Sequence, residues 1–244
     1  MTDIYTKVSL VAKSMVFHAG CNIALFIHCC ATLLIVPLLN IKQRQYVFTR
    51  YNVFVLWWCK VTCGVHYEIE GQENVPEGPC IILSNHQSSW ETFLFQTLFS
   101  PLSTVLKKEL LKIPLFGWGM RLLEPIALDR AQPIQAFKQL ISQGHDRVSA
   151  NRSVLIFPEG TRVAIGDQVK FNRGGAALAH HSQIPIVPVA HNAGLCVPSK
   201  SFILTPGKIT VKIGAPIYSE GKSKKELYEV STKWIKSNRD ALMA

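Results

Sequence analysis

Charged residues are scarce in this chain of 244 amino acids, and they are unevenly distributed. They make up 17% of the sequence, against 48% hydrophobic residues, and none occurs in residues 15–41. About 20 apolar residues are enough to cross the core of a bilayer, so this run predicts contact with a membrane. It is too long for the apolar part of a cleaved signal peptide, and no clear small-residue cleavage site follows it.

A second apolar patch at residues 53–58 contains two tryptophans, which favour the headgroup level of a membrane. We therefore expect residues 1–64 to form a helix, a basic turn and a shorter second helix, either spanning or lying in the membrane. More basic residues follow the first run than precede it, which weakly places the remaining domain on the cytoplasmic side. They are Lys42, Arg44, Arg50 and Lys60, against Lys7 and Lys13.

Acidic residues are also few: 16 Asp and Glu oppose 26 Lys and Arg, which gives a formal net charge of +10. Such a balance suits nucleic acid, anionic lipid or an anionic substrate. No basic stripe interleaved with aromatic residues and no nucleic-acid-binding motif is present, so we expect no nucleic acid partner. Internal repeats and low-complexity segments are absent as well.

The seven cysteines are odd in number, and most lie in apolar stretches, which indicates reduced thiols rather than a disulfide framework. Only Cys59 and Cys63 have a spacing that suits a metal, and His66 is the one further ligand nearby. A structural zinc needs four ligands. We therefore expect no metal site.

Residues 65–244 are predicted to form one α/β domain, because short apolar runs alternate with helical patterns. Residues 71–79, at the start of this domain, are polar and turn-rich. The expected strands are residues 80–84, 103–106, 125–128, 154–157, 186–190 and 209–213. The expected helices are residues 89–99, 133–150, 174–181 and 224–240.

The sequence NHQSSWE, residues 85–91, follows the first of these strands. If His86 and Glu91 shared one helix, five steps of 100° would leave them about 140° apart. Ser88 and Glu91 fit a capping box, which would start the helix after Ser88 and leave His86 on the preceding turn. His86 and Glu91 could then form a catalytic pair, or Glu91 could do no more than cap the helix.

Three further blocks are candidates for chemistry. FPEGTR ends a strand and places Glu159 and Arg162 around a turn at Gly160; an ordinary turn closed by that ion pair is an equally good interpretation. Lys107, in KKELLK, precedes an apolar segment and could hold an anionic head beside an acyl chain, or be a solvated edge. In IPIVPVAHNAG the prolines favour an edge strand or a bulge. His191 could be a second base, but a structural role is favoured for it.

In this order, the four blocks resemble the glycerolipid acyltransferase family, in particular bacterial 1-acyl-sn-glycerol-3-phosphate acyltransferases. The resemblance extends over about residues 76–217, and the hydrophobic two-helix start also looks like this family. It implies a mixed, largely parallel sheet flanked by helices. It also implies transfer of an acyl group from acyl-CoA or acyl carrier protein to the sn-2 hydroxyl of lysophosphatidic acid, at the inner membrane of a bacterium and without a further cofactor.

By the same resemblance His86 is the general base and Glu91 its orienting partner. Lys107, Glu159, Gly160, Thr161 and Arg162 would form the phosphate-binding site. The family's usual acid is Asp, and Glu at position 91 keeps the charge but changes its reach. The acceptor could therefore be another lysolipid, such as a lyso-ornithine lipid. Two functions of a different kind also stay open, a serine-dependent lipid hydrolase and a non-catalytic membrane-binding module.

Overall fold

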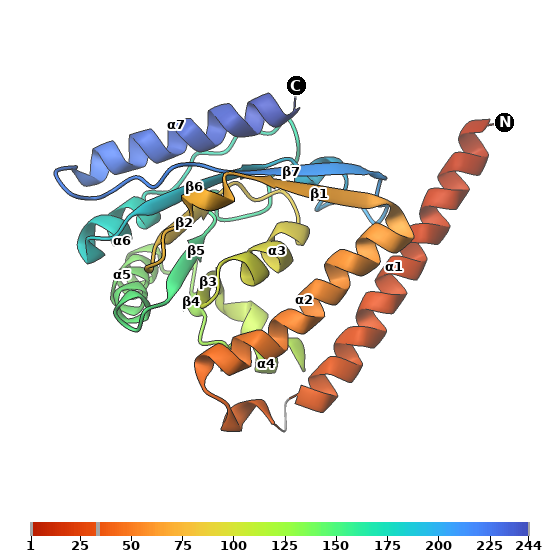
Figure 1. Ribbon diagram of the computed structural model, residues 1–244, viewed down its shortest axis with the longest axis horizontal. Helices are drawn as coiled ribbons and strands as arrows, with labels where there is room; N and C mark the ends of the chain where they lie inside the picture. The colour runs from red at the N-terminus through yellow and green to blue at the C-terminus, as the bar shows by residue number, and fades with distance from the viewer. Residues whose placement is uncertain (1, 33–34, 244) are drawn as a thin grey trace.

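The computed structural model describes residues 2–32 and 35–243. Its centre is a seven-stranded sheet with the order β1-β7-β6-β2-β5-β3-β4, covered by helices on both faces (Figure 1). All neighbouring strands are parallel except β6 and β7, so the expected mixed, largely parallel sheet is confirmed. The strands are β1 (Val65–Glu70), β2 (Ile81–Ser84), β3 (Leu102–Lys107), β4 (Ile126–Leu128), β5 (Ser153–Ile156), β6 (Ile186–His191) and β7 (Gly207–Ile213).

Seven α-helices and four short 3-10 turns make up the rest of the described secondary structure. The helices are α1 (Thr2–Thr32), α2 (Ile41–Cys63), α3 (Trp90–Leu98), α4 (Phe116–Leu122), α5 (Pro133–Ser149), α6 (Gly174–Ser182) and α7 (Lys224–Met243). The 3-10 turns are η1 (Val36–Leu38), η2 (Gln72–Asn74), η3 (Lys108–Lys112) and η4 (Ala193–Leu195). The six strands and four helices predicted for the α/β domain are present, with ends that differ by at most three residues.

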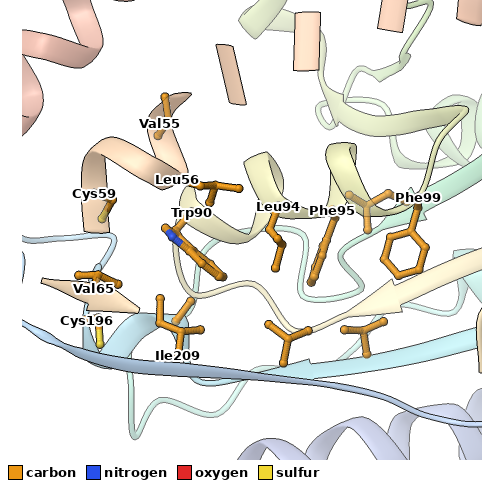
Figure 2. Close-up of a cluster of buried hydrophobic side chains, with 14 of the residues drawn as sticks. Val55, Leu56, Cys59, Val65, Trp90, Leu94, Phe95, Phe99, Cys196 and Ile209 are labelled. Carbon is orange, nitrogen blue, oxygen red and sulfur yellow. The ribbon is translucent and has the colours of Figure 1, made fainter. Parts of the chain in front are cut away.

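One face of the sheet packs against α2 and α3. Trp90, Leu94 and Phe95 of α3 point toward the sheet, while Val55, Leu56 and Cys59 of α2 close the same core beside them (Figure 2). Trp90 and Leu94 lie four residues apart and so one above the other on the helix, and Phe95 widens this buried side by 100°. The opposite face of the sheet is covered by α5, α6 and α7, which share a second core.

The N-terminal segment contains two helices, as expected. Asn40 caps α2 through a reciprocal capping box with Gln43. Helix α1 packs beside α2, where the Tyr51 hydroxyl donates to the Cys21 carbonyl at 3.3 Å. Residues Ile4–Thr32 are long and apolar enough to cross a membrane. Leu33 and Leu34, which belong to the predicted apolar run, lie outside the described residues.

Three features differ from expectation. Strand β1 was not predicted, although Val65, Tyr67 and Ile69 alternate with polar residues, which is the strand pattern. Helix α4 was not predicted either. The interpretation of the 184–194 prolines as an edge or bulge is wrong at Pro188, because β6 is an interior strand. Its antiparallel pairing with β7 begins only at Val189, one residue after the missing N–H.

The boundary predicted at residue 64 falls between α2 and β1, but the hydrophobic core crosses it. Val55, Leu56 and Cys59 are buried against the sheet and α3. The Gln45 side chain also accepts a hydrogen bond from the Leu102 amide at 2.8 Å. Helix α2 is therefore a structural part of the α/β unit.

We predict that a fragment of residues 64–244 does not fold cooperatively. It lacks the α2 side chains of this core, and each fully buried aliphatic side chain contributes roughly 1.5–3 kcal/mol, against a total stability of about 5–15 kcal/mol. A matched fragment that starts at Asn40 keeps α2 with its capping box and should keep one transition. Thermal unfolding followed by circular dichroism in mild detergent tests this, and equal transitions for both fragments would contradict it.

Candidate active site

The turn after β2 is tied to the end of the neighbouring strand β6. The Asn85 side chain is fully buried and pairs with the backbone of His191, donating to its carbonyl and accepting from its amide, both at 3.0 Å. Because β2 and β6 are parallel, both strands end at the same edge of the sheet. Such edges are where ligands bind in open α/β sheets.

His86 and Glu91 lie in direct contact. The Nδ1 atom of His86 is 2.7 Å from Oε1 of Glu91, and the Glu91 side chain is fully buried. A carboxylate can only accept, so Nδ1 carries the proton and donates it. The other ring nitrogen, Nε2, is then left with its lone pair free to accept a proton.

The same Glu91 oxygen also caps the turn. It accepts from the amides of Gln87 at 3.0 Å and Ser88 at 2.8 Å. Ser88 Oγ accepts from the Trp90 amide rather than from that of Glu91, so only the glutamate half of the expected capping box forms. Glu91 therefore both contacts His86 and caps the turn, through a single oxygen.

The Glu91 carboxyl is ionised despite its burial. Burial by itself would raise its pKa, but the hydrogen bonds from the His86 ring and the Ser88 amide outweigh burial and hold the pKa below its usual value. Its place in the first turn of α3 adds the favourable end of the helix dipole. A negative charge therefore lies directly behind the His86 ring.

An aromatic side chain stacks on one face of the imidazole. The ring of Phe157, which follows β5, stacks on His86 with centroids 4.0 Å apart and planes inclined by 15°. Phe157 in turn packs against Phe95 of α3. This role of Phe157 was not predicted from the sequence.

His191 is buried and both of its ring nitrogens are engaged. Nε2 donates to the Asn85 carbonyl at 2.8 Å, and Nδ1 accepts from the Ala193 amide at 3.2 Å. Burial lowers its pKa, so the ring is neutral at pH 7. This geometry fits the structural role favoured for His191.

The FPEGTR segment holds the backbone of His86 from both sides. A Glu159 oxygen, Oε2, accepts from the His86 amide at 2.7 Å, and the Val163 amide donates to the His86 carbonyl at 2.7 Å. Between them Gly160 adopts a φ of 71°, which favours glycine. A Cβ atom there would meet no neighbour within 4 Å, so backbone conformation rather than close approach selects this glycine.

Glu159 does not pair with Arg162, so the interpretation of FPEGTR as a turn closed by that ion pair is wrong. Its buried carboxylate turns inward, where Oε1 lies 3.6 Å from Nη1 of Arg239 on α7. Burial raises the pKa of Glu159 to about 7, against the opposing effects of the His86 amide and Arg239. The side chains of Thr161 and Arg162 are exposed, next to the Val163 amide that contacts His86.

Lys107 lies at the same edge of the sheet. It is the last residue of β3, and its ammonium group is 3.6 Å from Glu109 on the surface. β5 separates β3 from β2, so at about 4.8 Å per strand Lys107 starts about 10 Å from the strand that leads to His86. The structure therefore brings Lys107, Arg162 and His86 to one edge without direct contact between their side chains.

The burial of Arg239 beside the site was not predicted, although the sequence contains a pattern that indicates it. Leu227, Ser231, Ile235 and Arg239 recur every four residues and form the buried side of α7. An arginine that continues a buried helical stripe requires an acidic partner.

Comparison with known proteins identifies the type of site. An acyltransferase family model matches residues 66–192. The chain is 42% identical to 1-acyl-sn-glycerol-3-phosphate acyltransferase of Pseudomonas aeruginosa, over 91% of this chain and 88% of that one. The chain belongs to this acyltransferase family.

More distant relatives agree with this assignment. The acyltransferase is 29% identical to human 1-acyl-sn-glycerol-3-phosphate acyltransferase beta, over 86% of its own length and 78% of the relative's. The crystal structure of the 1-acyl-sn-glycerophosphate (LPA) acyltransferase PlsC from Thermotoga maritima superimposes with a TM-score of 0.82 at 25% identity, and 98% of each chain is covered. The predicted family and fold are thus confirmed.

We predict that Glu91→Gln in this acyltransferase lowers kcat by roughly 10³–10⁴-fold, as loss of the orienting carboxylate does in hydrolase triads. The amide keeps an oxygen for the turn but no charge behind the imidazole. Glu91→Asp keeps the charge and shortens the side chain by one methylene, so it should retain more activity. Exposed Glu229→Gln is the matched control. Turnover near the native value in a folded Glu91→Gln variant would contradict the pairing.

Proposed function

We propose that this chain transfers a fatty acyl group from a thioester to the sn-2 hydroxyl of 1-acylglycerol-3-phosphate, giving phosphatidic acid. The activities for which its relatives are named support this reaction. The observation that carries the proposal is the 2.7 Å contact between His86 Nδ1 and the buried Glu91 carboxylate. It leaves Nε2 as the group that accepts a proton.

In the proposed reaction, His86 Nε2 removes the proton of the sn-2 hydroxyl while the hydroxyl oxygen attacks the thioester carbonyl. The thiolate then leaves and takes that proton from the imidazolium, so an ester and a free thiol are formed. A positioned base contributes roughly 10²–10⁴-fold. The Glu91 charge keeps the ring in the reactive tautomer and stabilises the imidazolium.

This route needs no acylated serine. The Ser88 hydroxyl is fully buried and accepts from the Trp90 amide, which supports its assignment to the turn. A serine hydrolase that uses Ser88 or Ser89 is therefore the weaker alternative. The double variant with alanine at both positions should keep most of the transfer activity.

For the acceptor phosphate we propose a site formed by Arg162, Lys107 and the turn at Gly160 and Thr161. Arg162 and Lys107 are exposed cations at the edge of the sheet that carries His86. A guanidinium matches the geometry of a phosphate. Glu159 takes part by holding this turn and the backbone of His86, since its own carboxylate faces away from the surface.

The acyl donor is proposed to be acyl-CoA or acyl carrier protein, whose negative charge suits the net charge of +10. We place the protein at the cytoplasmic side of a bacterial inner membrane. Ser14 and His18 of α1 contact the backbone of Leu204 and Phe202, so α1 lies along the α/β unit. While it is held there it cannot cross the bilayer, and its exposed apolar side, which includes Ile23 and Phe26, would enter one leaflet.

The first test is an acceptor assay with purified protein. Lysophosphatidic acid should be acylated with at least one of the two donors, and His86→Ala should abolish turnover while the protein stays bound to vesicles. A strong preference for lyso-ornithine lipid would show that the proposed acceptor is wrong. Unchanged turnover in His86→Ala would refute the proposed base, and loss of vesicle binding would point to damage beyond the site.

A second test concerns the phosphate site. Arg162→Ala should lower kcat/KM for lysophosphatidic acid by about 10- to 100-fold, because a hydrogen bond to a charged group is worth about 1.5–3 kcal/mol. The loss should be small for monoacylglycerol, which carries no phosphate. Lys225→Ala, at the far end of α7, removes the same charge as a control. Equal losses for both acceptors would count against the assignment.

A further inference from the structure

The C-terminal helix reaches the catalytic turn through a buried ion pair. Nη1 of Arg239 lies 3.6 Å from Oε1 of Glu159, and the two side chains are only 5% and 1% exposed. The other oxygen of the same carboxylate accepts from the His86 amide at 2.7 Å. A chain of two contacts therefore connects α7 to the backbone of the proposed base.

Glu159 lies in a strongly charged environment. From α7 it faces the cations Arg239 and Lys236, while Asp240 binds Arg239 with a hydrogen bond of 2.7 Å. From α3 it faces the anion Glu91. Two buried carboxylates thus flank His86, one beside its ring and one at its amide, and Arg239 is the cation in contact with the second.

We propose that Arg239 is a positioning residue of the reaction: it keeps Glu159 ionised, and Glu159 in turn holds the backbone of His86. The inference rests on the proposed function, since it concerns the geometry of the same base. Hydrogen bonds to an ionised acceptor are about twice as strong as neutral ones. A protonated Glu159 would hold the His86 amide less firmly, and the imidazole would lose alignment with the acceptor hydroxyl.

The pKa of Glu159 agrees with this role. Burial raises it to about 7, and Arg239 acts in the opposite direction. Without Arg239 the pKa rises further, so the carboxyl takes up a proton at a higher pH. A rise of about one pKa unit from about 7 lowers the ionised fraction about fivefold at pH 7, and about tenfold only well below that pH.

Helix α7 has other anchors that keep it in place when Arg239 is replaced. Leu227 and Ile235 are fully buried in the second core. Near its end, the Leu242 carbonyl accepts from Asn192 at 3.1 Å, and Gln87 lies 3.3 Å from Met243 Sδ. A side chain similar in length to arginine can therefore be introduced without undocking the helix.

The experiment compares Arg239→Met and Arg239→Lys in the full-length protein by the pH dependence of kcat. For Arg239→Met the acidic limb of the profile should move up by about one pH unit. The loss of kcat should then be about fivefold at pH 7 and below about twofold at pH 9. KM for the acceptor should change little, and Arg239→Lys should restore most of the native profile.

Lys225→Met is the matched control, because it removes one cation from the exposed start of the same helix. Its profile should equal the native one. An unmoved acidic limb in Arg239→Met, or an equal loss at pH 7 and pH 9, would overturn the inference, since a merely structural role gives a loss that does not depend on pH.

A double variant with Glu159→Gln tests whether Arg239 acts through the charge of Glu159. The amide cannot ionise, so adding Arg239→Met to it should cause no further shift of the profile, and an additive shift would also overturn the inference. His86→Ala separates this question from the proposed function. If His86→Ala is active, the proposed base is wrong; if it is inactive while Arg239→Met keeps the native profile, only the role of Arg239 is wrong.

Discussion

One buried oxygen atom organises the centre of this protein. Oε1 of Glu91 accepts hydrogen bonds from the His86 ring and from the amides of Gln87 and Ser88. Removing any of these donors would leave a buried charge with fewer partners, which is costly. The turn, the start of α3 and the tautomer of His86 therefore depend on the same charge, and they form or fail together.

The sheet explains why so few residues suffice for the site. β6, β2, β5 and β3 are parallel neighbours, so residues that directly follow these strands meet at one edge although they are far apart in the sequence. Asn85 joins the end of β2 to that of β6. Phe157 and Glu159, which follow β5, fix the ring and the amide of His86. The ends of β2, β5 and β6 thus together constrain a single imidazole.

Most of the α/β pattern could be predicted from the sequence, because strands and helices differ in the period of their apolar residues. The pairing of His86 with Glu91 could be predicted too, since the capping pattern required His86 to precede the helix. What periodicity could not supply was the direction of side chains after strand ends. FPEGTR predicted a turn with Glu159 and Arg162 on it, but that Glu159 points inward to α7 depends on packing between segments about 80 residues apart. Pro188 shows the same limit, because strand order is not encoded in local composition.

The two carboxylates beside His86 differ in how their charge is stabilised. Glu91 has hydrogen bonds from three donors to one oxygen, and these overcome its burial and keep its pKa low. Glu159 has one amide and a cation at 3.6 Å, and its pKa is raised to about 7. The charge that orients the ring is thus fixed by local backbone, which forms with the turn itself. The charge at the His86 amide instead depends on α7, whose Arg239 lies about 80 residues beyond Glu159 along the chain, so the alignment of His86 is completed only when α7 docks.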